Sequence, residues 1–397
     1  MRSAQSHTVA ALSFLFLVMC SSVPAEAQAK AGAAKAAADQ PPEGPDLLLR
    51  DFAPRTHLDV KRTPIERARF PVIDVHFHMD GNADPLEVAR IMDGLNLQTV
   101  VNLGMKDMWG ETLKSYAEKW VKRFPGRFAV MANLDEKQIN HPDFSRQAVA
   151  QLREDVRNGA MALKIYKELG LVWKDAHGKL IRPDDPRFDP VWDACAELGI
   201  PVLIHVNDLK SFFDPIDRFN ERYLSLTLDR RSSWYGTVDI THDQLMQHFE
   251  NVIAKHPATT FIGAHVGMHY EHLYSGARWL DTYPNLYYDI AASCKHLGRQ
   301  PYTARRFMIR YQDRMLFGCD IGRVPNPEVY QYMFRVLETD DEYFEHVEPN
   351  AGLPWKIYGL YLPDEVLQKV YSLNARKLFP QFRRVPATTA ARPRAGR

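Results

Sequence analysis

Cysteine is scarce in this sequence, with four residues in a chain of 397. No two cysteines are spaced as C-x-x-C, which excludes a zinc ribbon held by thiolates. The 50 basic and 49 acidic residues nearly cancel, and no basic stripe is present, so we expect no nucleic-acid partner. Hydrophobic residues make up 45% of the chain, a share typical of soluble globular proteins and too high for a disordered chain.

Several catalytic motifs are also missing. No G-x-S-x-G pattern is present, which argues against lipase-type serine chemistry. No P-loop is present, which argues against a nucleotide-binding protein, and no H-E-x-x-H motif is present, which argues against a zincin metalloprotease. The first apolar strand is followed by His76-Phe77-His78 rather than by a glycine-rich turn, so the dinucleotide-binding fingerprint is absent as well.

The amino-terminal segment, residues 1–27, has the pattern of a secretory signal peptide. Arg2 supplies the positive end, an apolar run follows from Val9 to Cys20, and Ala25-Glu26-Ala27 fits a small-x-small cleavage site. We therefore expect an exported protein, periplasmic or secreted; a membrane anchor that stays in place is the alternative. No other apolar run approaches about 18 residues, so we expect no membrane span in the mature chain.

Composition divides the rest of the chain into three parts. Residues 28–69 are rich in alanine and proline and form a predicted linker and lead-in. Residues 70–380 carry the predicted fold. Residues 381–397 are poor in apolar side chains and form a predicted flexible tail.

Within residues 70–380, short apolar runs alternate with segments of helical spacing. Eight runs are predicted strands: Val72–Val75, Thr99–Leu103, Phe128–Ala132, Ala162–Ile165, Pro201–Ile204, Thr260–Gly263, Leu286–Tyr288 and Met315–Phe317. Eight helices are predicted between and after them: Pro85–Leu95, Glu111–Phe124, Phe144–Arg157, Pro190–Leu198, Asp243–Lys255, Tyr270–Thr282, Thr303–Tyr311 and Pro327–Leu337.

Eight strand–helix units predict parallel strands and the α/β class, as a (β/α)8 TIM barrel. A long inserted loop follows the fifth strand, and an extra helix, Pro363–Leu378, is predicted to end the fold. The alternative is an open doubly wound sheet.

Histidine is the abundant residue, with 15 in the chain, and several lie at predicted strand ends. Asp74, His76 and His78 alternate along the first strand and are expected on one face, the barrel interior. Two imidazoles at the carboxyl end of a barrel strand would form a metal clamp at the mouth of the barrel.

Three other strands end in residues of the same chemical type. His205 follows the fifth strand, His265 the sixth and Asp320 the eighth. Three imidazoles and a carboxylate suit Zn²⁺ and also Mn²⁺, Fe²⁺ or Co²⁺. Lys164 lies inside the apolar fourth strand, where a charge is costly unless it is paired. Either its side chain extends to the solvent at the barrel mouth, or it has a role in the metal site.

The stretches FPVIDVHFHMD, PVLIHVND, FIGAHVGMH and MLFGCDIG, taken together, resemble the amidohydrolase superfamily and more closely its amidohydrolase-related branch. That branch includes aminocarboxymuconate-semialdehyde decarboxylase and resorcylate-type decarboxylases beside hydrolases. The resemblance spans residues 70–320 and implies a metal-dependent enzyme on a TIM barrel. It does not specify a substrate.

The resemblance also implies a role for each strand-end residue. His76, His78 and His205 would be metal ligands, and Asp320 would be a ligand or a base acting on water. His265 would be an acid/base, or part of a second metal site. Lys164 matches the strand-four lysine of the binuclear hydrolases, which keeps a two-metal site open. We expect one firmly held Zn²⁺, and a second metal only if Lys164 is carbamylated.

Substrate contacts are expected from the loop that runs from Asn207 to Asp239, which is rich in arginine and aromatic residues. Arg218 or Arg222 would clamp a substrate carboxylate, while Tyr166 and Trp234 would line the pocket. The alternative is that these arginines pair with acidic residues of the same loop and only order it.

The leading hypothesis is a metal-dependent hydrolase that activates water to cleave an amide, ester or lactone bond in a small molecule. The alternative is a metal-dependent decarboxylase of an aromatic or unsaturated carboxylic acid. A noncatalytic ligand-binding barrel is the third hypothesis, and the complete set of ligand-type residues argues against it. The sequence leaves a homodimer open. His269 and Asp289 have no assigned role. We expect His269 on a surface helix, with a position at the barrel mouth as the alternative, and Asp289 either beside the site or in a turn.

Overall fold

The computed structural model describes residues 46–48, 52, 54–104, 112–347 and 353–384. The chain divides into two units, Met1–Asp59 and Val60–Arg397. The predicted signal peptide and most of the predicted linker lie outside the described residues. All helices and strands considered below belong to the second unit.

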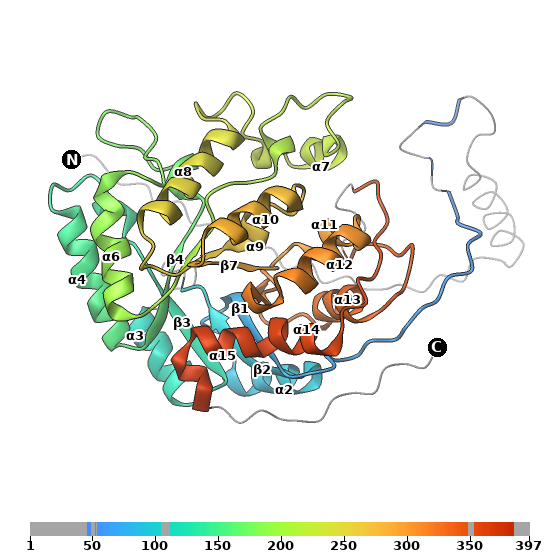
Figure 1. The fold of residues 1–397 in the computed structure, drawn as a ribbon, viewed down its shortest axis with the longest axis horizontal. Coiled ribbons are helices and arrows are strands. Elements are labelled where there is room, and N and C mark those ends of the chain that lie inside the picture. The colour runs from blue at the N-terminus through green and yellow to red at the C-terminus, as the bar shows by residue number, and fades with distance from the viewer. Residues whose placement is uncertain (1–45, 49–51, 53, 105–111, 348–352, 385–397) are drawn as a thin grey trace, which may run out of the picture. The chain divides into compact units, whose positions relative to one another are not determined.

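A single parallel sheet organises the second unit (Figure 1). Its strands follow one another in the order β8-β7-β6-β5-β4-β3-β2-β1-β9. Their bounds are β1 Val72–Met79, β2 Leu97–Asn102, β3 Phe128–Asn133, β4 Ala160–Ile165, β5 Val202–Ile204, β6 Phe261–Gly263, β7 Leu286–Asp289, β8 Met315–Leu316 and β9 Gly322–Arg323. The eight strands predicted from sequence correspond to β1–β8.

Backbone hydrogen bonds between β1 and the chain after β8 close the sheet into a barrel. Val75 N donates to Phe317 O over 3.0 Å, and Asp320 N donates to His76 O over 2.8 Å. His78 and Met79 then pair with β9, which the sequence did not predict. The architecture is therefore the expected α/β TIM barrel.

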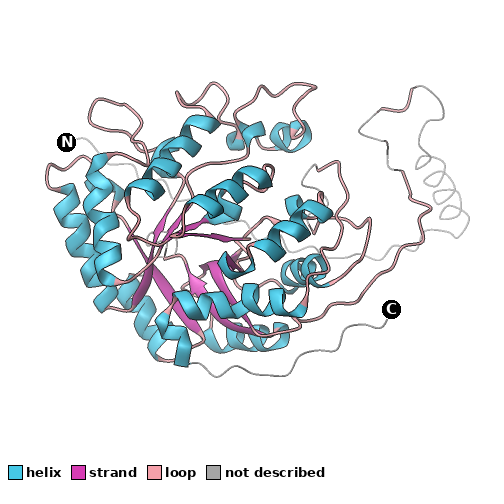
Figure 2. Cartoon of the chain, viewed as in Figure 1, coloured by secondary structure: helices cyan, strands magenta, loops and turns pink. Residues whose placement is uncertain are grey.

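Helices surround the strands (Figure 2). They are α2 Pro85–Leu95, α3 Leu113–Tyr116, α4 Phe144–Arg157, α5 Glu168–Leu171, α6 Asp189–Leu198, α7 Tyr223–Leu228, α8 His242–Lys255, α9 Ala264–Gly267, α10 Leu273–Thr282, α11 Cys294–Leu297, α12 Pro301–Arg310, α13 Pro327–Glu338, α14 Asp364–Gln368 and α15 Asn374–Leu378. Two π-helical segments, Ala117–Lys122 and Lys369–Leu373, continue α3 and α14. Short 3₁₀ turns lie at Glu136–Gln138, Pro186–Phe188, Lys210–Phe212, Arg230–Ser232, Gln312–Arg314 and Pro380–Arg384.

Local sequence explains where helices begin. Asp84 accepts a hydrogen bond from Leu86 N at the start of α2, with Pro85 in the first helical position. Thr241 and Gln244 form a capping box at the start of α8. The four short helices α5, α7, α9 and α11 were not predicted, because too few residues repeat in them to show a helical period.

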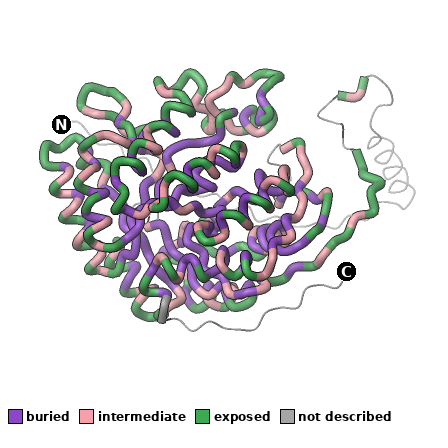
Figure 3. The backbone as a smooth tube through the Cα atoms, viewed as in Figure 1, coloured by how far each residue is buried: buried purple, intermediate pink, exposed green. Residues whose placement is uncertain are grey.

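The strands form the buried centre of the unit (Figure 3). Ile73, Val75, Leu203 and Leu316 belong to an apolar cluster inside the barrel, and this cluster also contains Phe379 and Phe382. Since Phe382 is only 2% exposed, the predicted flexible tail cannot begin at residue 381. The chain packs as a 3₁₀ turn to Arg384, because an aromatic side chain there covers the barrel interior.

No helix among the described residues is long and apolar enough to cross a bilayer.

Candidate metal centre

A β-bulge in β1 arranges its ligand-type side chains. Between Asp74 and Phe77, β1 gains one residue relative to β2, whose paired residues are Val100 and Asn102. Because the extra residue interrupts the alternation of faces, Val75 lies in the interior cluster and Phe77 in the outer one. The prediction that Asp74 shares a face with His76 and His78 was therefore wrong. Asp74 instead bonds to Tyr330 of α13.

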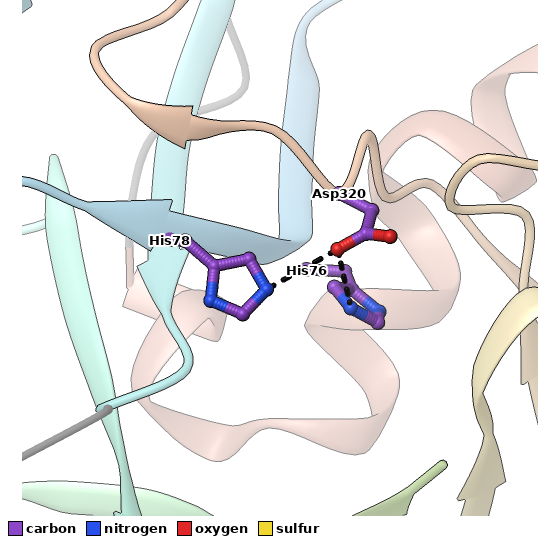
Figure 4. Close-up of side chains that lie close together, drawn as sticks. All are labelled: His76, His78 and Asp320. Carbon is purple, nitrogen blue, oxygen red and sulfur yellow. Dashed lines mark hydrogen bonds and ion pairs between the residues drawn. The ribbon is translucent and has the colours of Figure 1, made fainter. Parts of the chain in front are cut away.

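Asp320 meets the two histidines of β1 (Figure 4). Its Oδ1 lies 3.3 Å from His76 Nε2 and 3.2 Å from His78 Nε2. Burial alone would raise the pKa of the Asp320 carboxyl, but the neighbouring imidazoles hold it well below its usual value. Asp320 also has a φ of 60°, in the left-handed region that a non-glycine residue rarely adopts.

Asp289, at the end of β7, contacts His76 at Nδ1, the ring nitrogen that does not face Asp320. Its Oδ2 lies 2.8 Å from His76 Nδ1, and both side chains are buried. Because a carboxylate only accepts, His76 donates from Nδ1 and presents Nε2 to Asp320. A carboxylate behind a ligating imidazole is the usual arrangement at protein metal sites.

His265 follows β6 in an unusual left-handed turn. His265, Val266, Gly267 and Met268 all have φ between 57° and 64°. His265 Nδ1 donates to Ala291 O over 2.8 Å, which leaves Nε2 facing Asp320 Oδ2 at 3.9 Å. Glycine is required at position 267, because an added Cβ would overlap the ring of Tyr288.

His205, at the end of β5, lies beside His265, with ring centroids 4.5 Å apart. Its Nε2 is buried without a hydrogen-bond partner. Burial, followed by the nearby His265 and Lys164, lowers the pKa of His205 well below its ordinary value, so the imidazole is neutral. A buried neutral imidazole with a free nitrogen is available as a ligand.

Lys164 and Tyr166 enter the site from the fourth strand and its end. Lys164 is 1% exposed, and its Nζ has no hydrogen-bond partner. Burial lowers the pKa of Lys164 to about 8. Nζ lies 5.1 Å from the ring centroid of Tyr166, whose ring stacks near His78 with centroids 6.2 Å apart.

The donor set fits a metal ion. Ligand atoms of His76, His78 and Asp320 all lie within 4.8 Å of one another. Two donors bound to one ion at about 2.1 Å are about 3–3.5 Å apart, which is the spacing of Asp320 Oδ1 from each imidazole. His205 is not a member of this cluster and adjoins it through His265.

The residues expected to bind substrate are dispersed. Trp234 donates from Nε1 to Asp208 Oδ2 over 2.8 Å, and Lys167 pairs with the same carboxylate oxygen over 2.7 Å. Arg222 is buried, with Nη2 3.1 Å from His296 Nε2. Arg218 does not join them: it is exposed and lies over the ring of Phe219.

A cavity of about 440 Å³ lies among the segments that follow β5, β6 and β7. Its wall includes Ser211 from the loop after β5, Tyr270 from the segment after β6 and His296 from the segment after β7. Burial raises the pKa of Tyr270 well above its usual value, helped by the carboxylates of Glu271, Asp208 and Asp320. Tyr270 therefore lines the cavity and interacts with the charge of Asp320.

Sequence reasoning left Asp289 open and missed Asp208 and His296. Asp289 follows an apolar strand as the other candidate ligands do, so the same pattern could have selected it. His296 lies in a helical segment and does not directly follow an apolar strand, yet it is 2% exposed and stacks on Tyr270. The prediction for His269 was wrong: it is buried against Trp279, with ring centroids 4.5 Å apart.

Comparison with solved structures relates the chain to TIM-barrel proteins. Dihydroxybenzoic acid decarboxylase from Polaromonas sp. JS666, with bound manganese and the inhibitor 2-nitroresorcinol, is 14% identical with a TM-score of 0.51, covering 78% of this chain and 97% of that chain. An uncharacterised TIM-barrel protein from Bordetella bronchiseptica is 16% identical with a TM-score of 0.48, covering 79% and 100%. A 4-oxalomesaconate hydratase from Rhodopseudomonas palustris is 15% identical with a TM-score of 0.46, covering 79% and 96%.

No curated protein matches the sequence. A protein-family model described as amidohydrolase matches residues 73–381, from the second residue of β1 to beyond the end of α15. The chain therefore belongs to the amidohydrolase family, and members of that superfamily are metal-dependent enzymes, hydrolases and decarboxylases among them.

Proposed function

We propose that this protein is an exported metal-dependent hydrolase that cleaves an amide, ester or lactone bond in a small molecule. The observation that carries the proposal is the position of Asp320. One carboxylate oxygen lies between two imidazoles, and the other faces His265 at 3.9 Å. Asp320 can thus both hold a metal and exchange a proton with an acid/base group.

His76, His78 and Asp320 would hold a divalent transition metal, with His205 as the fourth ligand. Such a metal, when bound, would polarise a carbonyl group and lower the pKa of water. Asp320 would accept the proton of the attacking water through the oxygen that faces His265. Asp320 would transfer that proton to His265 Nε2, and His265 would deliver it to the departing amine or alkoxide, since the Nδ1 proton is committed to Ala291 O.

The substrate would lie at the barrel mouth and extend into the cavity of about 440 Å³, a volume suited to a small molecule. This placement is supported by Tyr270, which lines the cavity and interacts with the charge of Asp320. A buried Lys164 without a hydrogen-bond partner would carry the carbamate of a second metal site.

A substrate panel in ¹⁸O-labelled water tests the proposal. Metal-loaded protein is incubated with lactones, esters, amides and aromatic acids while ¹⁸O incorporation and CO2 release are followed. We expect ¹⁸O in a product carboxylate, loss of turnover in His265→Gln, and no effect of His177→Gln, which alters an exposed histidine. Release of CO2 without ¹⁸O incorporation would replace hydrolysis by decarboxylation.

A further inference from the structure

Asp74 is a buried carboxylate that the proposed chemistry does not use. It is completely buried, and the bulge in β1 turns it away from the imidazoles toward α13. We propose that Asp74 and Tyr330 form a clamp that positions the metal ligands His76 and Asp320. The inference rests on the proposed metal site and adds two positioning residues to it.

The clamp joins β1, which carries His76, to the segment after β8, which carries Asp320. Asp74 Oδ1 accepts from His76 N over 2.9 Å and from Cys319 N over 3.3 Å. The first amide belongs to one ligand and the second belongs to the residue before the other, Asp320. A single oxygen atom thus sets the separation of the backbone at both ligands, where Asp320 N also donates to His76 O.

Tyr330 fixes the orientation of that carboxylate. Its hydroxyl donates to Asp74 Oδ2 over 2.5 Å, and the Cys319 thiol donates to the Tyr330 oxygen over 3.2 Å. All three side chains are buried, so no solvent competes for these bonds. A fully bonded polar network in the interior is rigid, because each group left without a partner would be costly.

The consequence for the site is geometric. Helix α13 lies outside the sheet, and through Tyr330 it holds the carboxylate that spans β1 and the end of β8. Loss of the hydroxyl leaves Asp74 Oδ2 without this donor and lets the carboxylate turn, which loosens the two amides on Oδ1. Metal affinity depends on donor positions held within about 0.5 Å, so loss of the hydroxyl should lower the affinity for the metal.

The test is the dissociation constant of Zn²⁺ from the full-length protein, measured by chelator competition, together with thermal unfolding of the metal-free protein. Tyr330→Phe keeps the ring and should weaken Zn²⁺ binding by about tenfold, the scale found for groups that support ligands. Tyr371→Phe is the matched control, since that buried hydroxyl donates to another buried carboxylate, Glu338. Tyr371→Phe should leave Zn²⁺ affinity unchanged even if it lowers the melting temperature as much as Tyr330→Phe does.

A second pair of variants keeps the test decisive if Tyr330→Phe folds poorly. Asp74→Asn retains an oxygen acceptor for both amides, so it should bind Zn²⁺ more tightly than Asp74→Ala. Equal affinity in wild type, Tyr330→Phe and Asp74→Ala would overturn the clamp and leave the metal site standing. Absence of Zn²⁺ binding in the wild type would overturn the proposed function and the clamp together.

Discussion

At the scale of single residues, protons and a metal compete for the same nitrogen atoms. Burial alone would lower the pKa of His76, but the carboxylates of Asp289 and Asp320 raise it to about 9. Burial lowers the pKa of His78, His205 and His265 instead. In the metal-free protein, His76 is therefore the imidazole of this group that holds a proton at neutral pH.

Metal binding should consequently strengthen as pH rises. An imidazole coordinates only when neutral, so binding must displace the proton of His76 at any pH below about 9. The same raised pKa stabilises the metal-free fold fully below the unfolded pKa of about 6.5, and this stabilisation is lost as pH passes about 9. Chelator competition across this range checks the sign, and an affinity independent of pH would contradict it.

Removing the charge of the Asp289 carboxylate should weaken metal binding without unfolding the protein. Asp289→Asn keeps the volume of the side chain but loses the strong acceptor at His76 Nδ1. We expect metal affinity to fall by about 10–100-fold. Asp341→Asn, at a completely buried carboxylate that pairs with Arg335, is the control and should leave metal affinity unaltered.

At the scale of elements, the site is made where strands end. The apolar runs and the ligand-type residues that follow them are visible in the sequence, so the positions of His76, His78, His205 and Asp320 could be predicted. The bulge in β1 could not, because an extra residue leaves no mark in an alternating pattern. The left-handed turn at His265 was equally hidden, since Val266 is a residue type that disfavours this conformation.

Close backbone packing should make the segment just after β8 sensitive to one added methyl group. A Cβ added at Gly318 would lie 2.6 Å from His76 Cβ and 3.2 Å from Ala291 Cβ. Gly318→Ala should therefore displace His76, abolish tight metal binding and cost about 1–3 kcal/mol of stability.

Gly94→Ala provides the comparison, because a Cβ there meets nothing within 4 Å on helix α2. It should be neutral or slightly stabilising in thermal unfolding. Equal metal affinity in both alanine variants would show that close packing at Gly318 does not fix the position of His76.

At the scale of the whole molecule, the alternation of strands and helices was enough to predict the barrel. The positions of the loop side chains around the site could not be predicted, because they depend on contacts with residues distant in sequence. Arg222 reaches His296, which is far along the chain, whereas Arg218 only four residues earlier is exposed. The same limit applies to Phe382, which the composition of the tail assigns to a flexible segment.

Closure of the barrel interior by the carboxyl-terminal turn should contribute measurably to stability. Phe382→Ala empties a buried site in the cluster that contains Phe379, so it should lower the free energy of unfolding by about 3–5 kcal/mol. Phe219→Ala alters a side chain that is 79% exposed and should change stability little. Similar unfolding curves for both variants would contradict the packing of residues 380–384.

The central claim is that His76, His78 and Asp320 hold a divalent metal. Elemental analysis of purified protein, wild type and His76→Ala, tests it most directly. At least one transition-metal ion per chain is predicted in the wild type, and the metal should be lost from His76→Ala while the fold is retained. A folded wild-type protein that contains no transition metal, and takes none up after incubation with Zn²⁺ or Mn²⁺, would contradict the claim.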